Sequence, residues 1–208
     1  MAERQRWALT GPVGAGKSTA ASYLASRGAA VVDGDALGHV LLAEPALASA
    51  IRAAFGEGVW RAGAIDRAAL GALVFGQPAL LRRLDELALP LLSARMRVAL
   101  DAAGAGAARL AVLEAAVYFL MPPPGPIHLT VSIVASPETR LRRLLAAGRG
   151  SEADLRRRIE AQTQLEALWA RADVVLENEG TAATLAVALD RLLAERRLVT
   201  DGAEGRLA

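Results

Sequence analysis

The sequence predicts an α/β domain in which about five parallel strands are flanked by helices and interrupted by a helical insertion. Three observations predict this class. Short apolar segments alternate with longer segments of helical periodicity. A glycine-rich turn joins the first apolar segment to the first helix. About seventy residues of mostly helical pattern separate the second apolar segment from the third, which is far more than one crossover helix needs.

Five apolar runs are predicted to be the strands of the sheet. Strands of a parallel sheet are covered on both faces and therefore read as nearly continuous apolar runs. Because helical segments separate the runs, we expect the strands to be parallel. The runs are residues 7–10, 29–32, 110–113, 129–134 and 174–176.

The first and last helices are predicted from their apolar spacing. The first spans residues 18–27 and ends at Gly28, a residue that commonly ends helices. The last spans about 181–197, and residues 201–208 are expected to form a flexible tail.

The segment 137–169 is predicted to form two helices. Gly148 and Gly150 break it, and Ser151 is placed to cap the second helix, with Asp154 three residues on. The predicted division of the chain is a core formed by 1–35, 105–136 and 171–200, an insertion at 36–104, and a lid with its following helix at 137–170.

Composition favours a single globular domain. The 208 residues are 53% apolar, which is enough to bury a core, and the formal net charge is only +2. With 4% aromatic residues and arginines spread along helices, we expect no nucleic-acid partner. No signal segment or membrane-length apolar run is visible, so we expect a cytoplasmic protein without a membrane partner. The absence of cysteine excludes disulfides and thiolate metal sites, and the oligomeric state is left open.

Residues 11–19, GPVGAGKST, carry the strongest functional signal. Gly11, Gly16, Lys17 and Ser18 satisfy the pattern GxxxxGK(S/T) between a predicted strand and a predicted helix. Glycines let successive N–H groups point at one anion, and the helix N-terminus adds a positive dipole end. Lys17 is the only lysine of the chain, and its compact ammonium suits a place between two phosphates where a guanidinium would not fit. The alternative is a glycine-rich turn with a chance lysine.

We therefore expect a P-loop NTPase that uses ATP and Mg²⁺. Ser18 would place its hydroxyl on the metal ion. Whether GTP replaces ATP stays open. The residues of this loop expected to bind ATP are Gly11, Pro12, Val13, Gly14, Ala15, Gly16, Lys17, Ser18 and Thr19.

Asp33 and Asp35 follow the second predicted strand at its carboxyl end, the edge where open α/β sheets bind ligands. Two carboxylates there can divide the work of accepting a proton from an attacking hydroxyl and ordering the Mg²⁺ shell. The alternative is an Asx turn that caps a helix beginning near Ala36. Beside a phosphate loop we favour the chemical interpretation.

The ordered motifs resemble those of the dephospho-coenzyme A kinases. They are LTGPVGAGKST, VVDGDALGH, FGEGVWRAGAIDRAAL followed by LVF, RIEAQ and ADVVLENEG, and together they span nearly the whole chain. The resemblance implies a kinase core, a helical substrate lobe and a lid that closes over the phosphates. It also implies that ATP phosphorylates the ribose 3′-hydroxyl of a small-molecule partner, dephospho-coenzyme A.

The resemblance also implies roles for individual residues. Thr10 and Asp35 would lie at the reacting hydroxyl, with Asp35 as general base and, together with Ser18, as a metal ligand. Asp33 would position the substrate or the metal. Arg143 would bind the triphosphate, and Asn178 would lie near the adenine. Further expected contacts are Arg149 for ATP, and His39, Arg67 and Tyr118 for the substrate.

Several of these positions have a plain alternative. A packed or surface role for His39 is as well supported as a substrate contact, and core packing is the safer interpretation of Tyr118. Glu114, at the end of the third strand, either orders a Mg²⁺ water or is merely solvated. Among the arginines of the lid, we expect all but Arg143, Arg149 and Arg158 to lie on solvent faces.

The departures from the family pattern gather on the acceptor side. A His-Pro pair of the family is Leu89-Pro90 here, a following arginine is Ser93, and a PLLFE-like motif is replaced by residues 116–120. An arginine of the lid tip aligns with Ala147. Two alternatives to the family activity therefore stay open: a kinase for another hydroxyl-bearing metabolite, and a nucleotide-binding protein that transfers nothing.

Overall fold

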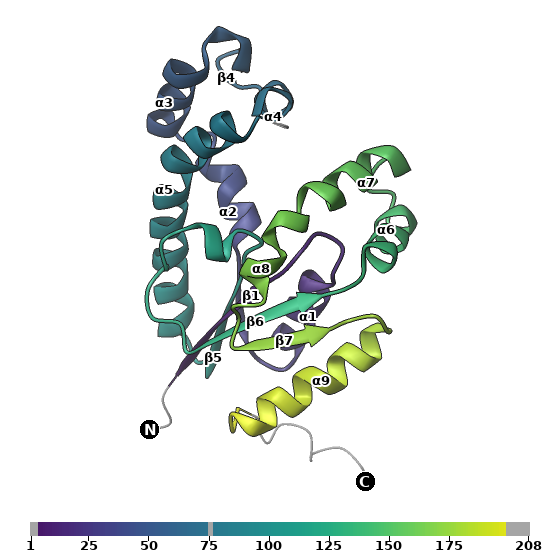
Figure 1. Ribbon diagram of the computed structural model, residues 1–208. Coiled ribbons are helices and arrows are strands. Elements are labelled where there is room, and N and C mark those ends of the chain that lie inside the picture. The colour runs from purple at the N-terminus through teal and green to yellow at the C-terminus, as the bar shows by residue number, and fades with distance from the viewer. Residues whose placement is uncertain (1–3, 75–76, 199–208) are drawn as a thin grey trace.

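A five-stranded parallel sheet forms the centre of the molecule (Figure 1). The computed structural model describes residues 4–74 and 77–198, so the predicted tail lies outside the described residues. The strands are β1 (Gln5–Thr10), β2 (Ala30–Asp33), β5 (Leu110–Glu114), β6 (Leu129–Val134) and β7 (Val174–Glu177). Their order is β2-β5-β1-β6-β7, and each neighbouring pair is parallel. The predicted fold class is confirmed.

The strand register brings the predicted site residues to one edge of the sheet. Asp33 at the end of β2 is paired with Glu114 at the end of β5, and Glu114 is paired with Leu9 of β1. Thr10, the last residue of β1, is paired with Ser132 of β6. The phosphate loop that follows Thr10 therefore leaves the sheet beside the two acids.

Helices cover both faces of the sheet. On one face lie α1 (Lys17–Ser26) and α9 (Ala182–Glu195), and on the other lie α2 (Gly34–Leu41) and α5 (Pro78–Ala105). The side chains of β1 alternate between the two layers, as a strand requires: Trp7 and Leu9 belong to the buried cluster under α1 and α9, and Ala8 to the opposite cluster. The phosphate loop is thus anchored between two packed cores.

The insertion between β2 and β5 is mostly helical, as predicted. Besides α2 and α5 it holds α3 (Pro45–Phe55), η1 (Glu57–Val59) and α4 (Arg67–Val74). It also contains a hairpin, β3 (Trp60–Arg61) and β4 (Ala64–Ile65), which the sequence did not predict. The hairpin turn uses Ala62 and Gly63, both at positive φ, and alanine in this place is a weaker turn signal than asparagine or aspartate.

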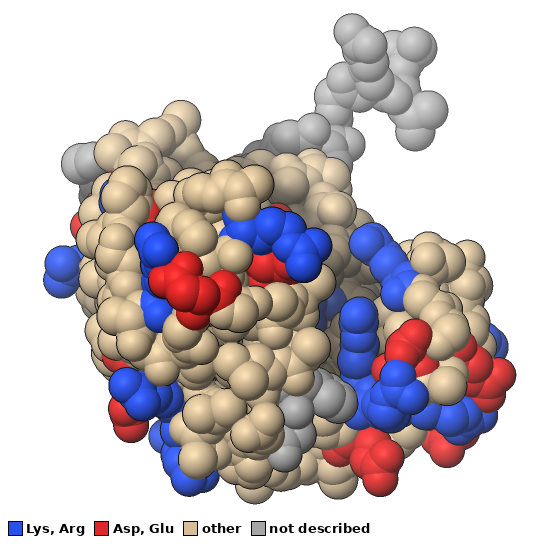
Figure 2. Space-filling view, turned by 90° about the horizontal axis from the view of Figure 1, so that it is seen from above, with Lys and Arg blue, Asp and Glu red and all other residues tan. Residues whose placement is uncertain are grey.

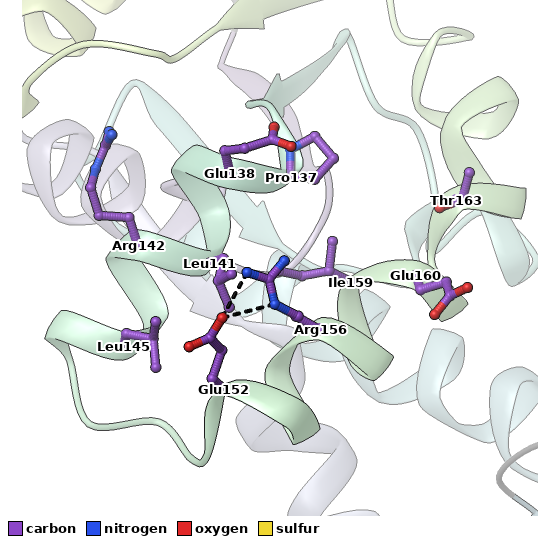
Figure 3. A pocket seen from close by; sticks show the side chains of 10 residues that line it. All are labelled: Pro137, Glu138, Leu141, Arg142, Leu145, Glu152, Arg156, Ile159, Glu160 and Thr163. Carbon is purple, nitrogen blue, oxygen red and sulfur yellow. Dashed lines mark hydrogen bonds and ion pairs between the residues drawn. The ribbon is translucent and has the colours of Figure 1, made fainter.

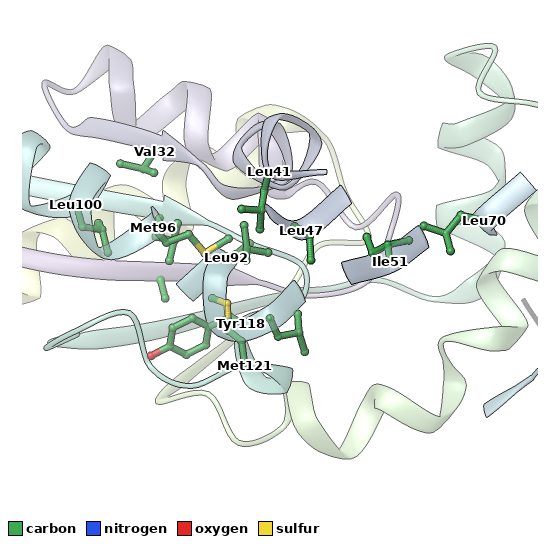
Figure 4. Packing of buried hydrophobic residues seen from close by; sticks show 14 of the residues in the cluster. Val32, Leu41, Leu47, Ile51, Leu70, Leu92, Met96, Leu100, Tyr118 and Met121 are labelled. Atoms are coloured by element: carbon green, nitrogen blue, oxygen red, sulfur yellow. The ribbon is translucent and has the colours of Figure 1, made fainter. Parts of the chain in front are cut away.

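The core of the insertion continues into the core of the sheet (Figure 4). Leu92, Met96 and Leu100 lie along α5, and Met96 is fully buried. Val32 of β2 belongs to the same cluster, as does Ile51 of α3. The insertion is therefore not a separate hydrophobic unit, and α5 fixes it on the sheet.

The lid segment rises at the same edge of the sheet as the insertion (Figure 1). Its first helix, α6 (Pro137–Ala146), ends before Gly148 and Gly150, and Ser151 caps α7 (Glu152–Ala161) by accepting a hydrogen bond from the Asp154 N–H. This part of the prediction is confirmed. The second predicted helix is divided into three shorter elements: α7 is followed by η3 (Thr163–Leu165) and α8 (Glu166–Trp169). The last short helix is η2 (Tyr118–Leu120), between β5 and β6.

Candidate active site

Three glycines of the phosphate loop hold backbone conformations that other residues rarely adopt. Gly11, Gly14 and Gly16 have φ values of 130°, 77° and 109°. A Cβ on Gly11 would lie 2.1 Å from the carbonyl oxygen of Ile133, and a Cβ on Gly16 would lie 2.4 Å from Nδ2 of Asn178. The loop is therefore pressed against β6 and against the residue after β7, and side chains are excluded at both contacts.

Lys17 is held inside the loop. Its side chain is buried, and Nζ donates hydrogen bonds to the carbonyl oxygens of Gly11 at 2.9 Å and Pro12 at 3.0 Å. Burial lowers the pKa of Lys17, the carboxylates of Asp35 and Glu114 oppose this shift, and Arg140 adds to it. The ammonium thus lies near carboxylates and a second cation without an ion-pair partner of its own among the described residues.

A depression of about 390 Å³ beside the loop is lined by the hydroxyl and carboxyl groups predicted to be functional. Ser18, Asp33, Asp35 and Glu114 all line it. The Ser18 hydroxyl donates a hydrogen bond of 2.7 Å to Oε1 of Glu114. Burial raises the pKa of Glu114, Ser18 and Lys17 oppose this, and Asp33 and Asp35 add to it. Glu114, whose role the sequence left open, is therefore part of this cluster.

Asp33 has the capping role that the sequence offered as the alternative to chemistry. Its side chain accepts a hydrogen bond of 2.8 Å from the Ala36 N–H and so begins α2. Capping uses one oxygen and leaves the other carboxylate oxygen for a ligand. Asp35 lies in the first turn of α2 and His39 in its last turn, and both are exposed. The cap fixes where α2 presents Asp35.

Arg143 and Asn178 meet on the other side of the phosphate loop. Nδ2 of Asn178 donates to the Ala15 carbonyl at 2.7 Å, and Nη1 of Arg143 donates to the same oxygen at 3.3 Å. Nη2 of Arg143 donates to the Gly180 carbonyl at 2.7 Å. Asn178 is buried, with 5% of its surface exposed. Both residues therefore brace the loop from α6 and from the end of β7.

The lid also contacts the loop through a residue to which the sequence assigned no role. Oε1 of Gln162, the residue after α7, accepts a hydrogen bond of 3.0 Å from the Val13 N–H. Gln162 belongs to the RIEAQ motif, so the motif was visible but the contact was not. This bond ties the base of the lid to a backbone donor of the phosphate loop.

Some predicted residues lie elsewhere. Arg67 begins α4 in the insertion, and Arg149 lies on the turn between α6 and α7; both are exposed. Tyr118 is buried in the core cluster of the insertion and stacks edge-on against Phe119. Thr10 is fully buried below the loop, where Oγ1 donates to the Ala116 carbonyl at 3.4 Å, and Thr19 is exposed on α1. Their functional roles remain predictions.

One expectation about the lid arginines is wrong. Arg140 was expected on a solvent face of α6, but only 2% of its surface is exposed. It lies three residues before Arg143 and so on the same side of the helix, a spacing that the sequence already contained. Arg142, Arg156 and Arg157 are exposed as expected. Arg142 and Arg156 line a groove of about 710 Å³ between α6 and α7, where Arg156 pairs with Glu152 (Figure 3).

Seen from above, the insertion and the lid face each other across a hollow, and Lys and Arg side chains lie along it on the lid side (Figure 2).

The described residues contain no helix that is both long and apolar enough to cross a membrane. In the same part of the chain, no three His, Cys, Asp or Glu side chains form a cluster that would hold a metal ion unaided. A metal at this site would need oxygen atoms from a ligand as well.

Comparison with known proteins identifies the family. The family model described as dephospho-CoA kinase matches residues 7–184. The dephospho-CoA kinase of Anaeromyxobacter dehalogenans is 38% identical over 203 residues, which cover 95% of this chain and 93% of the relative. The dephospho-CoA kinase of Latilactobacillus sakei is 32% identical over 195 residues, which cover 93% of each chain.

Solved structures share the fold. TT1252 from Thermus thermophilus is 33% identical, has a TM-score of 0.73, and is aligned over 93% of this chain and 98% of its own. Shikimate kinase from Acinetobacter baumannii, at 17% identity and a TM-score of 0.53 over 93% of this chain and 95% of its own, shares the fold. The family match runs from β1 into α9 and includes the phosphate loop and both acids. The chain therefore belongs to the dephospho-CoA kinase family.

Proposed function

We propose that this protein transfers a phosphoryl group from ATP to the ribose 3′-hydroxyl of dephospho-CoA, giving CoA and ADP in the last step of CoA biosynthesis. One observation carries the proposal. Ser18 of the phosphate loop, Glu114, Asp33 and Asp35 line a single depression beside a buried lysine. Phosphoryl transfer needs a phosphate cradle, a cation and an acid within one site, and these residues supply them.

The phosphate loop binds the polyphosphate of ATP in this proposal. Gly11, Gly14 and Gly16 orient the loop, and the N-terminus of α1 adds its positive dipole end. Lys17 moves its ammonium from the carbonyls of Gly11 and Pro12 to phosphate oxygens. Because that ammonium is already partly dehydrated, it loses less hydration on binding than an exposed lysine would.

The donor set at the depression fits Mg²⁺. A hydroxyl and carboxylates are the hard oxygen ligands that this ion prefers, and Mg²⁺ is usually completed by substrate phosphates and waters. We assign Ser18 and Asp35 as the protein ligands, with Glu114 orienting the Ser18 hydroxyl. The chemistry supplied by a bound Mg²⁺ is neutralisation of negative charge on phosphate oxygens.

Asp35 is the proposed general base. It is exposed in the first turn of α2, whose start is fixed by the Asp33 cap, so its carboxylate can reach a hydroxyl that enters between the insertion and the lid. Asp33 and His39 are proposed to position the acceptor. Arg143 and Asn178 hold the nucleotide side through their shared contact with Ala15.

The departures from the family pattern on α5 are compatible with this function. Leu89 is buried in the core of the insertion, and the Ser93 hydroxyl donates a hydrogen bond of 2.7 Å to the Pro122 carbonyl. Both side chains are engaged in packing. This supports the view that these positions maintain the lobe and that their replacement leaves the acceptor unchanged.

The decisive experiment measures ADP production from MgATP by the purified protein with and without dephospho-CoA, with Lys17→Ala as the blank. We expect dephospho-CoA to stimulate turnover and mass spectrometry to detect CoA. ATP binding without turnover for any acceptor would instead identify a nucleotide-binding protein, and turnover with a different hydroxyl compound would identify another kinase. Either result contradicts the proposal.

Two substitutions test the division of work between the acids. Asp35→Asn is expected to lower kcat by roughly 10²- to 10⁴-fold, the contribution of a general base, while ATP affinity is retained. Asp33→Asn keeps a residue that caps helices as well as aspartate does, so any loss reports its charge rather than the start of α2. Unchanged turnover in Asp35→Asn would remove the base assignment.

A further inference from the structure

Among residues 4–74 and 77–198, Arg140 is the most deeply buried charged side chain that the proposed mechanism does not use. Only 2% of its surface is exposed, although arginine is almost never fully buried without a partner. In the part of the chain that the structure describes, its Nε and Nη1 atoms have no hydrogen-bond partner. Each therefore presents an N–H group that is shielded from solvent and uncompensated, which is costly unless a ligand satisfies it.

The position of Arg140 indicates what that ligand is. Its carbonyl oxygen lies 3.0 Å from where a Cβ on Gly14 would be, so α6 touches the phosphate loop at this residue. Its charge reaches the ammonium of Lys17, whose pKa it helps to lower. Two cations that repel each other beside one anion-binding loop favour an anion between them.

The neighbouring arginine does not have free donors in the same way. Arg143, one turn further along α6, donates to the carbonyls of Ala15 and Gly180. The carboxylates of Glu166 and Glu138 favour the charged form of Arg140. Both glutamates are exposed, and neither accepts a hydrogen bond from Nε or Nη1 of Arg140. Of Arg140 and Arg143, which share one side of α6, Arg140 is the arginine whose buried Nε and Nη1 donors stay available for phosphate oxygens.

We propose that Arg140 is a phosphate-binding residue, which donates Nε–H and Nη1–H to oxygens of the polyphosphate bound on the loop, beside Lys17. Arg143 then braces the loop, and Arg140 contacts the ligand. The inference rests on the proposed use of ATP but not on the identity of the acceptor.

The test compares ligands that differ in phosphate content. Arg140→Met removes the charge and keeps an unbranched side chain, and Arg142→Met is the matched control, because Arg142 is exposed on the same helix (Figure 3). Binding of ATP, inorganic tripolyphosphate and adenosine is measured by calorimetry without any acceptor. Loss of charge-assisted hydrogen bonds should weaken ATP and tripolyphosphate about 10- to 100-fold in Arg140→Met and leave adenosine unchanged. Arg142→Met should bind all three ligands as the wild type does.

A stability measurement separates this role from a structural one. If Arg140 awaits a ligand, Arg140→Met should unfold at a urea concentration no lower than the wild type, since an uncompensated buried charge has been removed. A lower midpoint with unchanged ATP affinity would make Arg140 a structural residue and overturn the proposal. Equal weakening of ATP and adenosine, or equal effects of the two Met variants, would overturn it as well.

A second variant covers the case in which Arg140→Met does not fold. Arg140→Lys keeps the charge but offers one point donor in place of two planar N–H groups. We expect it to fold, to bind ATP more weakly than the wild type by about fivefold or more, and to bind adenosine equally well. Wild-type ATP affinity in Arg140→Lys would refute the proposed contact. Wild-type protein that binds ATP but makes no CoA would overturn the acceptor assignment alone.

Discussion

Gly11 offers a stringent test of the structure, because two separate effects act against any side chain there. Its φ of +130° lies outside the range of other residues, and a Cβ would overlap the Ile133 carbonyl oxygen at 2.1 Å. The backbone strain costs about 1–3 kcal/mol. The overlap is with backbone of a central strand, so β6 must shift as well, and the total loss for Gly11→Ala should reach about 4 kcal/mol or more.

Two other glycines separate these effects. Gly28 has a φ of +90° but nothing within 4 Å of an added Cβ, so Gly28→Ala should show the strain alone, about 1–2 kcal/mol. Gly71 is exposed inside α4 with open space around it. Gly71→Ala should stabilise the protein by up to about 1 kcal/mol, because alanine is the better helix former.

Urea unfolding followed by tryptophan fluorescence measures the series, and Trp7, fully buried in β1, provides a probe beside the loop. The urea concentration at the unfolding midpoint should be highest for Gly71→Ala, followed by the wild type, Gly28→Ala and Gly11→Ala, with similar m values. Gly11→Ala should also lose ATP binding, and Gly28→Ala should keep it. A midpoint for Gly11→Ala equal to that of Gly28→Ala would refute the close contact with β6.

Three further predictions follow from groups at the loop. The pKa of Glu114 is raised in the folded state, so just above pH 4.5 the folded protein binds more protons than the unfolded chain. The free energy of unfolding should therefore fall as the pH rises through that window. Urea unfolding of Glu114→Gln at several pH values should lack this fall. The pKa of Lys17 is lowered in the folded state, so between the lowered value and pH 10.5 the unfolded chain binds more protons than the folded protein. The free energy of unfolding should therefore rise with pH in that range. Lys17→Met should lack this rise and should bind no ATP. Gln162→Ala removes the acceptor of the Val13 N–H, and losing a hydrogen bond worth about 1 kcal/mol should raise the rate of amide hydrogen exchange at Val13 about fivefold. Gln162→Glu keeps an acceptor oxygen and should leave this rate unchanged.

The strands could be predicted because a strand buried on both faces of a parallel sheet is a nearly continuous run of apolar residues. Residues 129–134 were predicted as a strand and form β6 with the same bounds. β1 begins two residues before its prediction, at Gln5, because Gln5 pairs with Leu110 of the neighbouring strand. Arg6 is tolerated in a central strand since its guanidinium reaches Asp101 at 2.9 Å. Pairing and ion pairs of this kind depend on distant residues and leave no local periodicity.

The site was predictable only in part, for the same reason. The phosphate-loop pattern identifies Lys17 and Ser18 locally, but the residues that hold the loop come from far along the chain. Asn178 is 163 residues from the Ala15 carbonyl that it binds, and Gln162 is 149 residues from Val13. Arg140 was misjudged because composition predicts exposure for arginine, whereas the packing of α6 against the loop decides its burial.

Burial of Lys17 and Arg140 beside the phosphate loop is unfavourable in the unliganded fold, and we expect it to strengthen the binding of an anion there. Desolvation of Lys17 and Arg140 takes place during folding, so a phosphate group that arrives later meets donors already stripped of water. A ligand present at about 100 times its Kd adds about 2.7 kcal/mol to the stability of the folded state. Arg140→Met should therefore be at least as stable as the wild type without ATP and less stable than the wild type at saturating wild-type ATP concentrations. This crossing of the two stabilities is expected of a residue that serves the ligand and not of one that serves the fold.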